Sequence, residues 1–67
     1  MTFQKLIFGL SLLSKYDGAE IGASDGVILV AIKNQKVVSV KDAKELKKIG
    51  WVYYDKDFSW GADVNIA

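Results

Sequence analysis

GVILVAI, the stretch from Gly26 to Ile32, is a continuous run of apolar, largely β-branched residues. Such a run is typical of a central strand covered on both faces, or of one covered on one face and used for contacts on the other. The weakly alternating stretch AEIGAS precedes it, and the Asp25-Gly26 step between them is a favoured hairpin turn. The sequence therefore predicts a β-hairpin whose second strand is central in a sheet.

A helix is predicted before this hairpin, from Phe3 to Lys15, with Thr2 in the N-cap position and Asp17-Gly18 ending it. Five residues at helical spacing form the predicted core stripe: Phe3, Leu6, Ile7, Leu10 and Leu13. Phe8 and Leu12 fall on roughly the opposite side. They either pack under another part of the fold or form an apolar contact for a partner or a second copy.

A second helix is predicted from Ser39 to Gly50, after a polar turn at Lys33 to Lys36. Ser39 with Asp42 resembles a capping box, and Gly50 stands where a C-cap glycine would. The predicted core stripe of this helix is Val40, Ala43, Leu46 and Ile49.

Two strands are predicted at the carboxyl end, from Trp51 to Tyr54 and from Trp60 to Ile66. In the second strand, one face of the period-two pattern consists of Trp60, Ala62, Val64 and Ile66. The element order is then αββαββ, which predicts a single two-layer α+β domain over residues 1–67, with an antiparallel sheet and both helices on one face.

The composition disfavours several classes of function. The 67 residues include no cysteine and no histidine, so disulfides, thiolate or imidazole metal sites and Cys–His or Ser–His pairs are excluded. We expect no enzyme activity and no cofactor, because no phosphate loop, nucleophile elbow or metal triad is present. Net charge is +1 and every cation is lysine, which disfavours sequence-specific DNA binding and attraction to membranes. The first apolar run is too short to span a bilayer, and we expect a cytoplasmic location.

The stretch YYDKDFSWGAD, Tyr53 to Asp63, alternates acidic or hydroxyl residues like a calcium loop. However, Trp60 stands where that loop needs glycine, and Ile66 where it needs a bidentate glutamate. The stretch therefore predicts a loop of about four or five residues between the last two strands, in which Asp residues accept local backbone hydrogen bonds.

This hairpin is also the leading candidate for a protein-contact surface, since tyrosine is enriched in binding hot spots. The candidate contact residues are Tyr53, Tyr54, Asp55, Asp57 and Phe58, together with Phe8 and Leu12 of the first helix. The alternative for the aromatic residues is cross-strand pairing that stabilises the hairpin. A homodimer held by the Phe8 and Leu12 face is a further hypothesis.

Lys41, Lys44 and Lys48 share a face of the second helix, which Glu45 partly neutralises. Such a face is ordinarily solvated, but it also suits weak, sequence-independent nucleic-acid binding with aromatic stacking.

LLSKYDGAEIGASDGVILVAI and LKKIGWVYYDKDFSW together resemble small phage and prophage accessory proteins of unknown function. Leu12, Leu13 and Tyr16 match the first part of that pattern; the last part is matched by Gly50, Trp51, Asp55, Asp57 and Trp60. The resemblance implies a protein that acts in the bacterial host cytoplasm. There it would bind and inhibit a host enzyme or a defence complex such as CRISPR-Cas, as anti-CRISPR proteins do.

Overall fold

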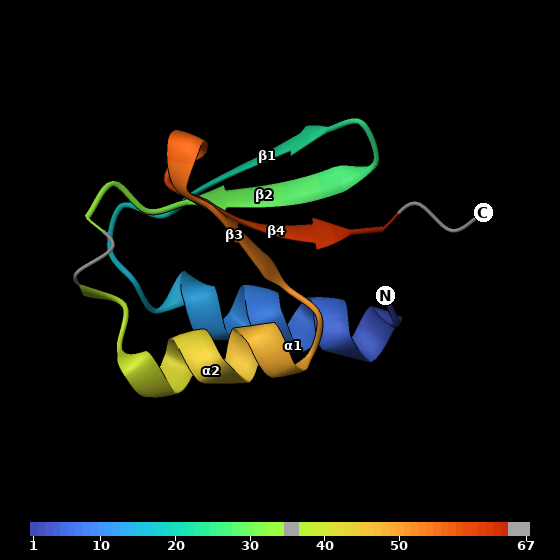
Figure 1. Cartoon of the computed structure of the whole chain (residues 1–67), viewed down its shortest axis with the longest axis horizontal. Coiled ribbons are helices and arrows are strands. Elements are labelled where there is room, and N and C mark those ends of the chain that lie inside the picture. Colours follow the sequence, from blue (N-terminus) through green and yellow to red (C-terminus); the bar gives the residue numbers. More distant parts are fainter. Residues whose placement is uncertain (35–36, 65–67) are drawn as a thin grey trace.

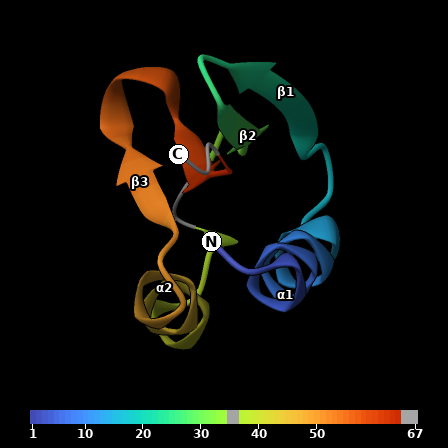
Figure 2. The same ribbon diagram turned by 90° about the vertical axis from the view of Figure 1, so that its right-hand side faces the viewer.

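The computed structural model describes residues 1–34 and 37–64, which form two layers (Figures 1 and 2). One layer is a four-stranded antiparallel sheet, and both helices lie on one side of it. The elements in chain order are α1 (Phe3–Ser14), β1 (Glu20–Ser24), β2 (Val27–Ala31), α2 (Val40–Lys48), β3 (Val52–Tyr54), the 3₁₀ turn η2 (Asp55–Asp57) and β4 (Ser59–Asp63). The predicted α+β class is confirmed.

The strands are arranged in the order β1-β2-β4-β3, so β2 and β4 are the central pair. The Asp25-Gly26 turn joins β1 to β2 as predicted, with φ of 51° and 78° at these residues. Positive φ at both central positions is what a type I′ turn requires, and the twist of such a turn matches that of the strands. The apolar run of β2 is therefore central in the sheet, covered by the helices on one face and, within residues 1–34 and 37–64, uncovered on the other (Figure 2).

Helix α1 begins as predicted, because the Thr2 hydroxyl accepts a hydrogen bond from the Lys5 N–H at 3.2 Å. Its predicted core stripe is partly wrong. Phe3 is 74% exposed and Ile7 44% exposed, whereas Gly9 is buried and Leu12 packs against the core. The buried face is rotated because it is centred near Gly9, where the Trp51 indole approaches the helix.

Helix α2 has both predicted ends. The Ser39 hydroxyl accepts from the Asp42 N–H at 3.1 Å. At the other end Gly50 has φ of 100°, the Gly50 N–H donates to Lys47 O, and the Trp51 N–H donates to Leu46 O. This pair of bonds is the Schellman arrangement, which needs a residue such as glycine that tolerates positive φ. The predicted stripe is wrong at Val40, which is 72% exposed.

The core lies between the helices and the inner face of the sheet. Its buried residues are Leu13, Val30, Ile32, Leu46, Trp51, Trp60 and Ala62. Trp60 and Ala62 thus face inward as predicted, while Ile66 of the predicted last strand and residues 35 and 36 of the predicted polar turn lie outside the described residues. Within the described part of the chain, neither helix has the length and apolar character needed to cross a membrane.

Candidate functional site: the uncovered face of the sheet

The face of the sheet away from the helices carries apolar residues at its centre. The strand register places three rows across this face: Glu20, Ala31, Ser59 and Tyr54; then Gly22, Leu29, Gly61 and Val52; then Ser24, Val27 and Asp63. An antiparallel sheet with one solvated face normally alternates apolar and polar residues along its strands. The outward positions of β2 are instead Val27, Leu29 and Ala31, so an apolar strip crosses the middle of this face.

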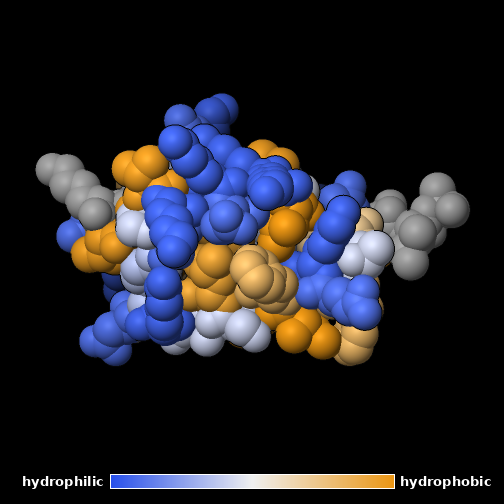
Figure 3. All heavy atoms as spheres, turned by 90° about the horizontal axis from the view of Figure 1, so that it is seen from below, coloured by the Kyte–Doolittle hydropathy of each residue, from blue (hydrophilic) through white to orange (hydrophobic). Residues whose placement is uncertain are grey.

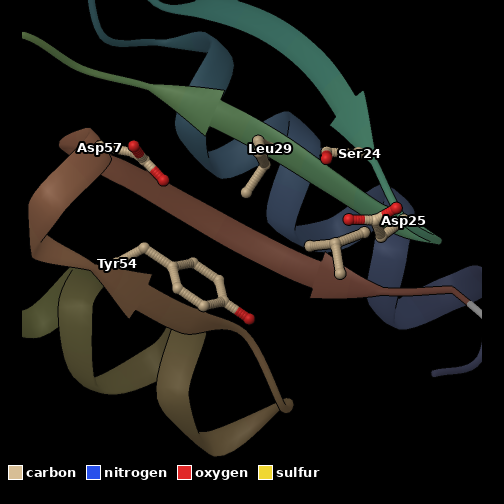
Figure 4. A pocket seen from close by; sticks show the side chains of 6 residues that line it. Ser24, Asp25, Leu29, Tyr54 and Asp57 are labelled. Atoms are coloured by element: carbon tan, nitrogen blue, oxygen red, sulfur yellow. The ribbon is translucent and has the colours of Figure 1, made fainter.

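A groove runs along β4 on this face, between Leu29 of β2 and Tyr54 of β3 (Figure 4). Gly61 lies beneath the Tyr54 ring, because a Cβ at this position would lie 2.4 Å from Tyr54 Cε2 and 3.1 Å from Leu29 Cδ2. The absence of a side chain at Gly61 therefore lets the Tyr54 ring lie against the β4 backbone. The residues that line the groove are Ser24, Asp25, Val27, Leu29, Tyr54 and Asp57.

The loop between β3 and β4 places Asp57 at one end of this groove. Tyr54 pairs with Ser59, and the residues between them form η2 and Phe58, which has the left-handed φ of 50°. The Ser59 hydroxyl donates to Asp57 O at 2.8 Å, and the Phe58 N–H donates to Asp55 O at 3.4 Å. The predicted loop length is confirmed, and these local bonds hold the acidic turn in one shape.

Carboxylates lie at both ends of the groove. Asp57 is at one end and Asp25, next to Ser24, is at the other (Figure 4). Leu29 and Tyr54 form the apolar walls between these carboxylates. The site is therefore an apolar slot with negative charge at each end, which is complementary to a segment that carries cations on either side of an apolar side chain.

The sequence-predicted contact residues are divided between different surfaces. Tyr54 and Asp57 line the groove, and Asp55 and the 55% exposed Phe58 belong to the adjoining loop. Tyr53 faces the helices instead, half-buried, with its ring centroid 5.3 Å from that of Trp60. This is the cross-strand aromatic pairing that the sequence left open as an alternative.

Phe8 and Leu12 lie on the helix side of the molecule, away from the groove. Phe8 is 49% exposed, whereas Leu12 is half-buried against the core. Figure 3 views this side and shows an apolar area among hydrophilic residues. The predicted contact residues of α1 therefore cannot act together with those of the hairpin on a single flat surface.

The lysines of α2 also lie in the helix layer. Lys41, Lys44 and Lys48 are all exposed, but the groove aromatic, Tyr54, is on the far face of the sheet. This arrangement disfavours the nucleic-acid hypothesis, because one short strand cannot stack its bases on Tyr54 and contact the α2 lysines with its phosphates.

A polar cluster around the buried Asp42 joins the two helices. The buried Asp42 carboxylate accepts a hydrogen bond from the Tyr16 hydroxyl and pairs with Lys15 Nζ at 2.6 Å, while the Ser39 N–H donates to Tyr16 Oη at 3.2 Å. The hydrogen bonds from Lys15 and Tyr16 hold the pKa of the Asp42 carboxyl below its ordinary value, and the bond to Asp42 raises the pKa of the Lys15 ammonium. Because its polar groups are satisfied within the fold, we assign this cluster a structural role.

Sequence reasoning missed the side of the groove that the β1–β2 hairpin forms: Ser24, Asp25, Val27 and Leu29. The run GVILVAI could have indicated it, because one of the two interpretations of this run was a central strand with one face used for contacts. Among residues 1–34 and 37–64, no group of three or more carboxylate, imidazole or thiolate side chains is arranged to hold a metal ion.

Comparisons with protein-family models, with curated proteins and with solved structures each found no match to this chain.

Proposed function

We propose that this chain is a protein-binding domain that holds an apolar side chain of its partner in the groove between Leu29 and Tyr54. The observation that carries the proposal is the apolar strip on the uncovered face of the sheet, with a carboxylate at each end of the groove. Apolar surface that the fold leaves uncovered and that polar residues surround is typical of interaction sites. Tyrosine at such a site provides a large contact area at low entropic cost.

The two ends of the groove define the chemistry of the partner. From Ser59, near the Asp57 end, to Asp63, near the Asp25 end, β4 spans about 13 Å at roughly 3.3 Å per residue. An extended partner segment covers that span with about five residues. The matching segment therefore has an apolar residue at its centre and lysine or arginine two positions away on either side.

A defined peptide tests this proposal. The probe is the capped pentapeptide Lys-Thr-Leu-Thr-Lys, and its charge-reversed control is Glu-Thr-Leu-Thr-Glu. We expect the cationic peptide alone to bind, with a dissociation constant on the order of 0.1–1 mM, and its affinity to fall as salt is added. Equal binding of the two peptides, or binding of neither, would overturn the proposal.

Substitutions in the groove walls test whether the peptide binds there. Leu29→Ala and Tyr54→Ala each remove one apolar wall. We expect each to lower the affinity for the cationic peptide by about fivefold or more, equivalent to roughly 1 kcal/mol. Val40→Ala is the matched control, because Val40 is an apolar residue that is 72% exposed on α2. It should bind the peptide like the wild type. The narrower role that the resemblance implied, inhibition of a host enzyme or defence complex, stays a prediction.

A further inference from the structure

β1 is an edge strand of the sheet, and no other described segment covers its outer edge. All of its residues, Glu20–Ser24, are exposed, and its register with β2 runs without a bulge. The opposite edge, β3, spans only Val52–Tyr54 and runs directly into the η2 turn. Very short edges, bulges, charged side chains and prolines prevent pairing between chains. β1 has no bulge, proline or lysine, and Glu20 is its single charged residue.

The backbone groups that β1 directs to the outside follow from its hairpin. In a two-residue hairpin the residues that flank the turn, here Ser24 and Val27, form a hydrogen-bonded pair, and bonded pairs then alternate along the strands. Bonds on the other side of β2 obey the same alternation: Val64 N–H to Gly26 O at 2.8 Å and Ile32 N–H to Phe58 O at 2.9 Å. The N–H and C=O groups of Ile21 and Ala23 consequently face outward.

We propose that β1 pairs antiparallel with β1 of a second copy of this chain, about a two-fold axis that passes midway between the two Gly22 residues. In this register Ile21 lies opposite Ala23 of the second copy, so every outward N–H and C=O of these residues finds a partner. Gly22 faces its own counterpart across the axis as a non-hydrogen-bonded pair. Only this register satisfies both outward residues of both strands.

The side chains of β1 are compatible with pairing about this axis. Glu20 lies opposite Ser24 of the second copy, so no charged residue of β1 faces its own counterpart. Asp25 lies past the end of the paired segment, opposite Ala19. Ile21, which is 69% exposed, meets Ala23 of the second copy on the helix side of the sheet.

Helix α1 extends this contact below the sheet. Leu10 and Ser14 line a groove with Glu20 and Ile21, so this flank of α1 faces the β1 edge. Phe3 and Ile7 continue the flank at helical spacing, and they are 74% and 44% exposed. The two-fold axis places this flank of α1 against the same flank of the second copy. Phe3 and Ile7, which the fold of one chain leaves exposed, would then pack in the interface. The peptide-binding grooves of both copies remain open on the other face.

Sedimentation equilibrium tests whether the pair forms. We expect the wild-type chain to shift from monomer to dimer as its concentration rises to about 1 mM, with a dissociation constant well below that value. Ile21→Lys places an edge lysine on β1, and we expect it to weaken the dimer at least about tenfold. The matched control is Val52→Lys on the other edge, where Val52 is 51% exposed, and it should dimerise like the wild type.

Single cysteines test the register, since the natural chain contains no cysteine. A Cβ added at Gly22 meets nothing within 4 Å, so Gly22→Cys fits the monomer. Cα atoms of a non-hydrogen-bonded antiparallel pair lie about 4.5 Å apart, within the range that a disulfide bridges. We expect Gly22→Cys to form a covalent dimer rapidly on mild oxidation. Ser24→Cys should not, because its counterpart lies about 13 Å away along the strands.

Each outcome decides for or against this interface. A wild-type chain that stays monomeric at about 1 mM contradicts it. So does equally fast crosslinking of Gly22→Cys and Ser24→Cys. A dimer that Ile21→Lys leaves intact but Phe8→Lys dissociates would place the contact on the helix side instead. None of these results depends on binding of the pentapeptide, so this inference and the proposed function can fail separately.

Discussion

The indole of Trp51 lies directly against Gly9, so closely that a Cβ at Gly9 would stand 2.2 Å from Trp51 Cε2 and Nε1. Trp51 is 1% exposed, and its Nε1–H donates to Lys5 O at 3.3 Å. The glycine therefore sets how close α1 lies to the turn that follows α2. This contact explains why the buried face of α1 is not centred on its most apolar stripe.

Gly9→Ala should destabilise the protein although alanine favours helix. The gain in helix propensity is about 1 kcal/mol, whereas forcing a methyl group into a packed core costs roughly 1–3 kcal/mol, and a 2.2 Å contact belongs at the upper end. We expect a net loss of about 1–2 kcal/mol in the free energy of unfolding, measured by urea denaturation. Ser11→Ala, on the exposed side of the same helix, is the control and should change the stability little. A Gly9→Ala protein more stable than the wild type would show that Trp51 does not pack there.

Gly61→Ala should affect the groove more than the stability. Its Cβ would collide with the Tyr54 ring, but Tyr54 is 39% exposed and can swing toward solvent. We therefore expect a loss of stability of less than about 1 kcal/mol, together with at least about fivefold weaker binding of the cationic pentapeptide. Gly22→Ala, in the same outward row, serves as the control because nothing lies within 4 Å of its added Cβ. Unchanged peptide affinity in Gly61→Ala would show that the Tyr54 ring is not a wall of the binding site.

Tyr16→Phe should weaken the connection between the two helices. The Tyr16 hydroxyl accepts from the Ser39 N–H and donates to the buried Asp42 carboxylate, so its removal leaves both groups short of a partner. We expect a loss of about 1–2 kcal/mol in the free energy of unfolding. Tyr54→Phe, which removes a hydroxyl from the exposed face, should lose much less. If the two variants are equally stable, the hydroxyl of Tyr16 contributes nothing specific.

The lowered pKa of Asp42 makes part of the stability depend on pH. A carboxyl whose pKa is lower in the folded than in the unfolded state stabilises the fold above its unfolded pKa, and this contribution disappears as the pH falls through the folded pKa. We expect the wild-type melting temperature to fall as the pH drops below about 4, and to fall less in Asp42→Asn. At pH 7 the variant should melt at a lower temperature than the wild type. If the melting temperatures of the two proteins change in parallel with pH between about pH 2 and pH 5, Asp42 does not have this role.

The parts of the fold that depend on local chemistry could be predicted from the sequence. The Asp25-Gly26 turn, the Thr2 and Ser39 caps and the Gly50 helix end all depend on the conformation or hydrogen bonds of neighbouring residues, and the structure contains each of them. The inward orientation of Trp60 and Ala62 followed from the period of two alone.

The rest could not be predicted because it depends on residues distant in the sequence. Gly9 contributes nothing to an apolar pattern, yet Trp51 makes it the centre of a buried face. The sequence predicts Asp42 only as a capping residue, but it also binds Tyr16 and Lys15 and so links the two helices. Likewise the groove exists only because Leu29 and Tyr54, from different hairpins, meet across β4.

An NMR titration of the ¹⁵N-labelled chain with the Lys-Thr-Leu-Thr-Lys peptide tests the proposed contact surface most directly. We expect the amide resonances of Leu29, Tyr54 and Gly61 to shift in a saturable, salt-sensitive manner, while those of the α2 lysines stay in place. The charge-reversed peptide should leave the spectrum unchanged. Shifts confined to the helix layer, or the same shifts with both peptides, would contradict a cation-selective apolar groove on the open face of the sheet.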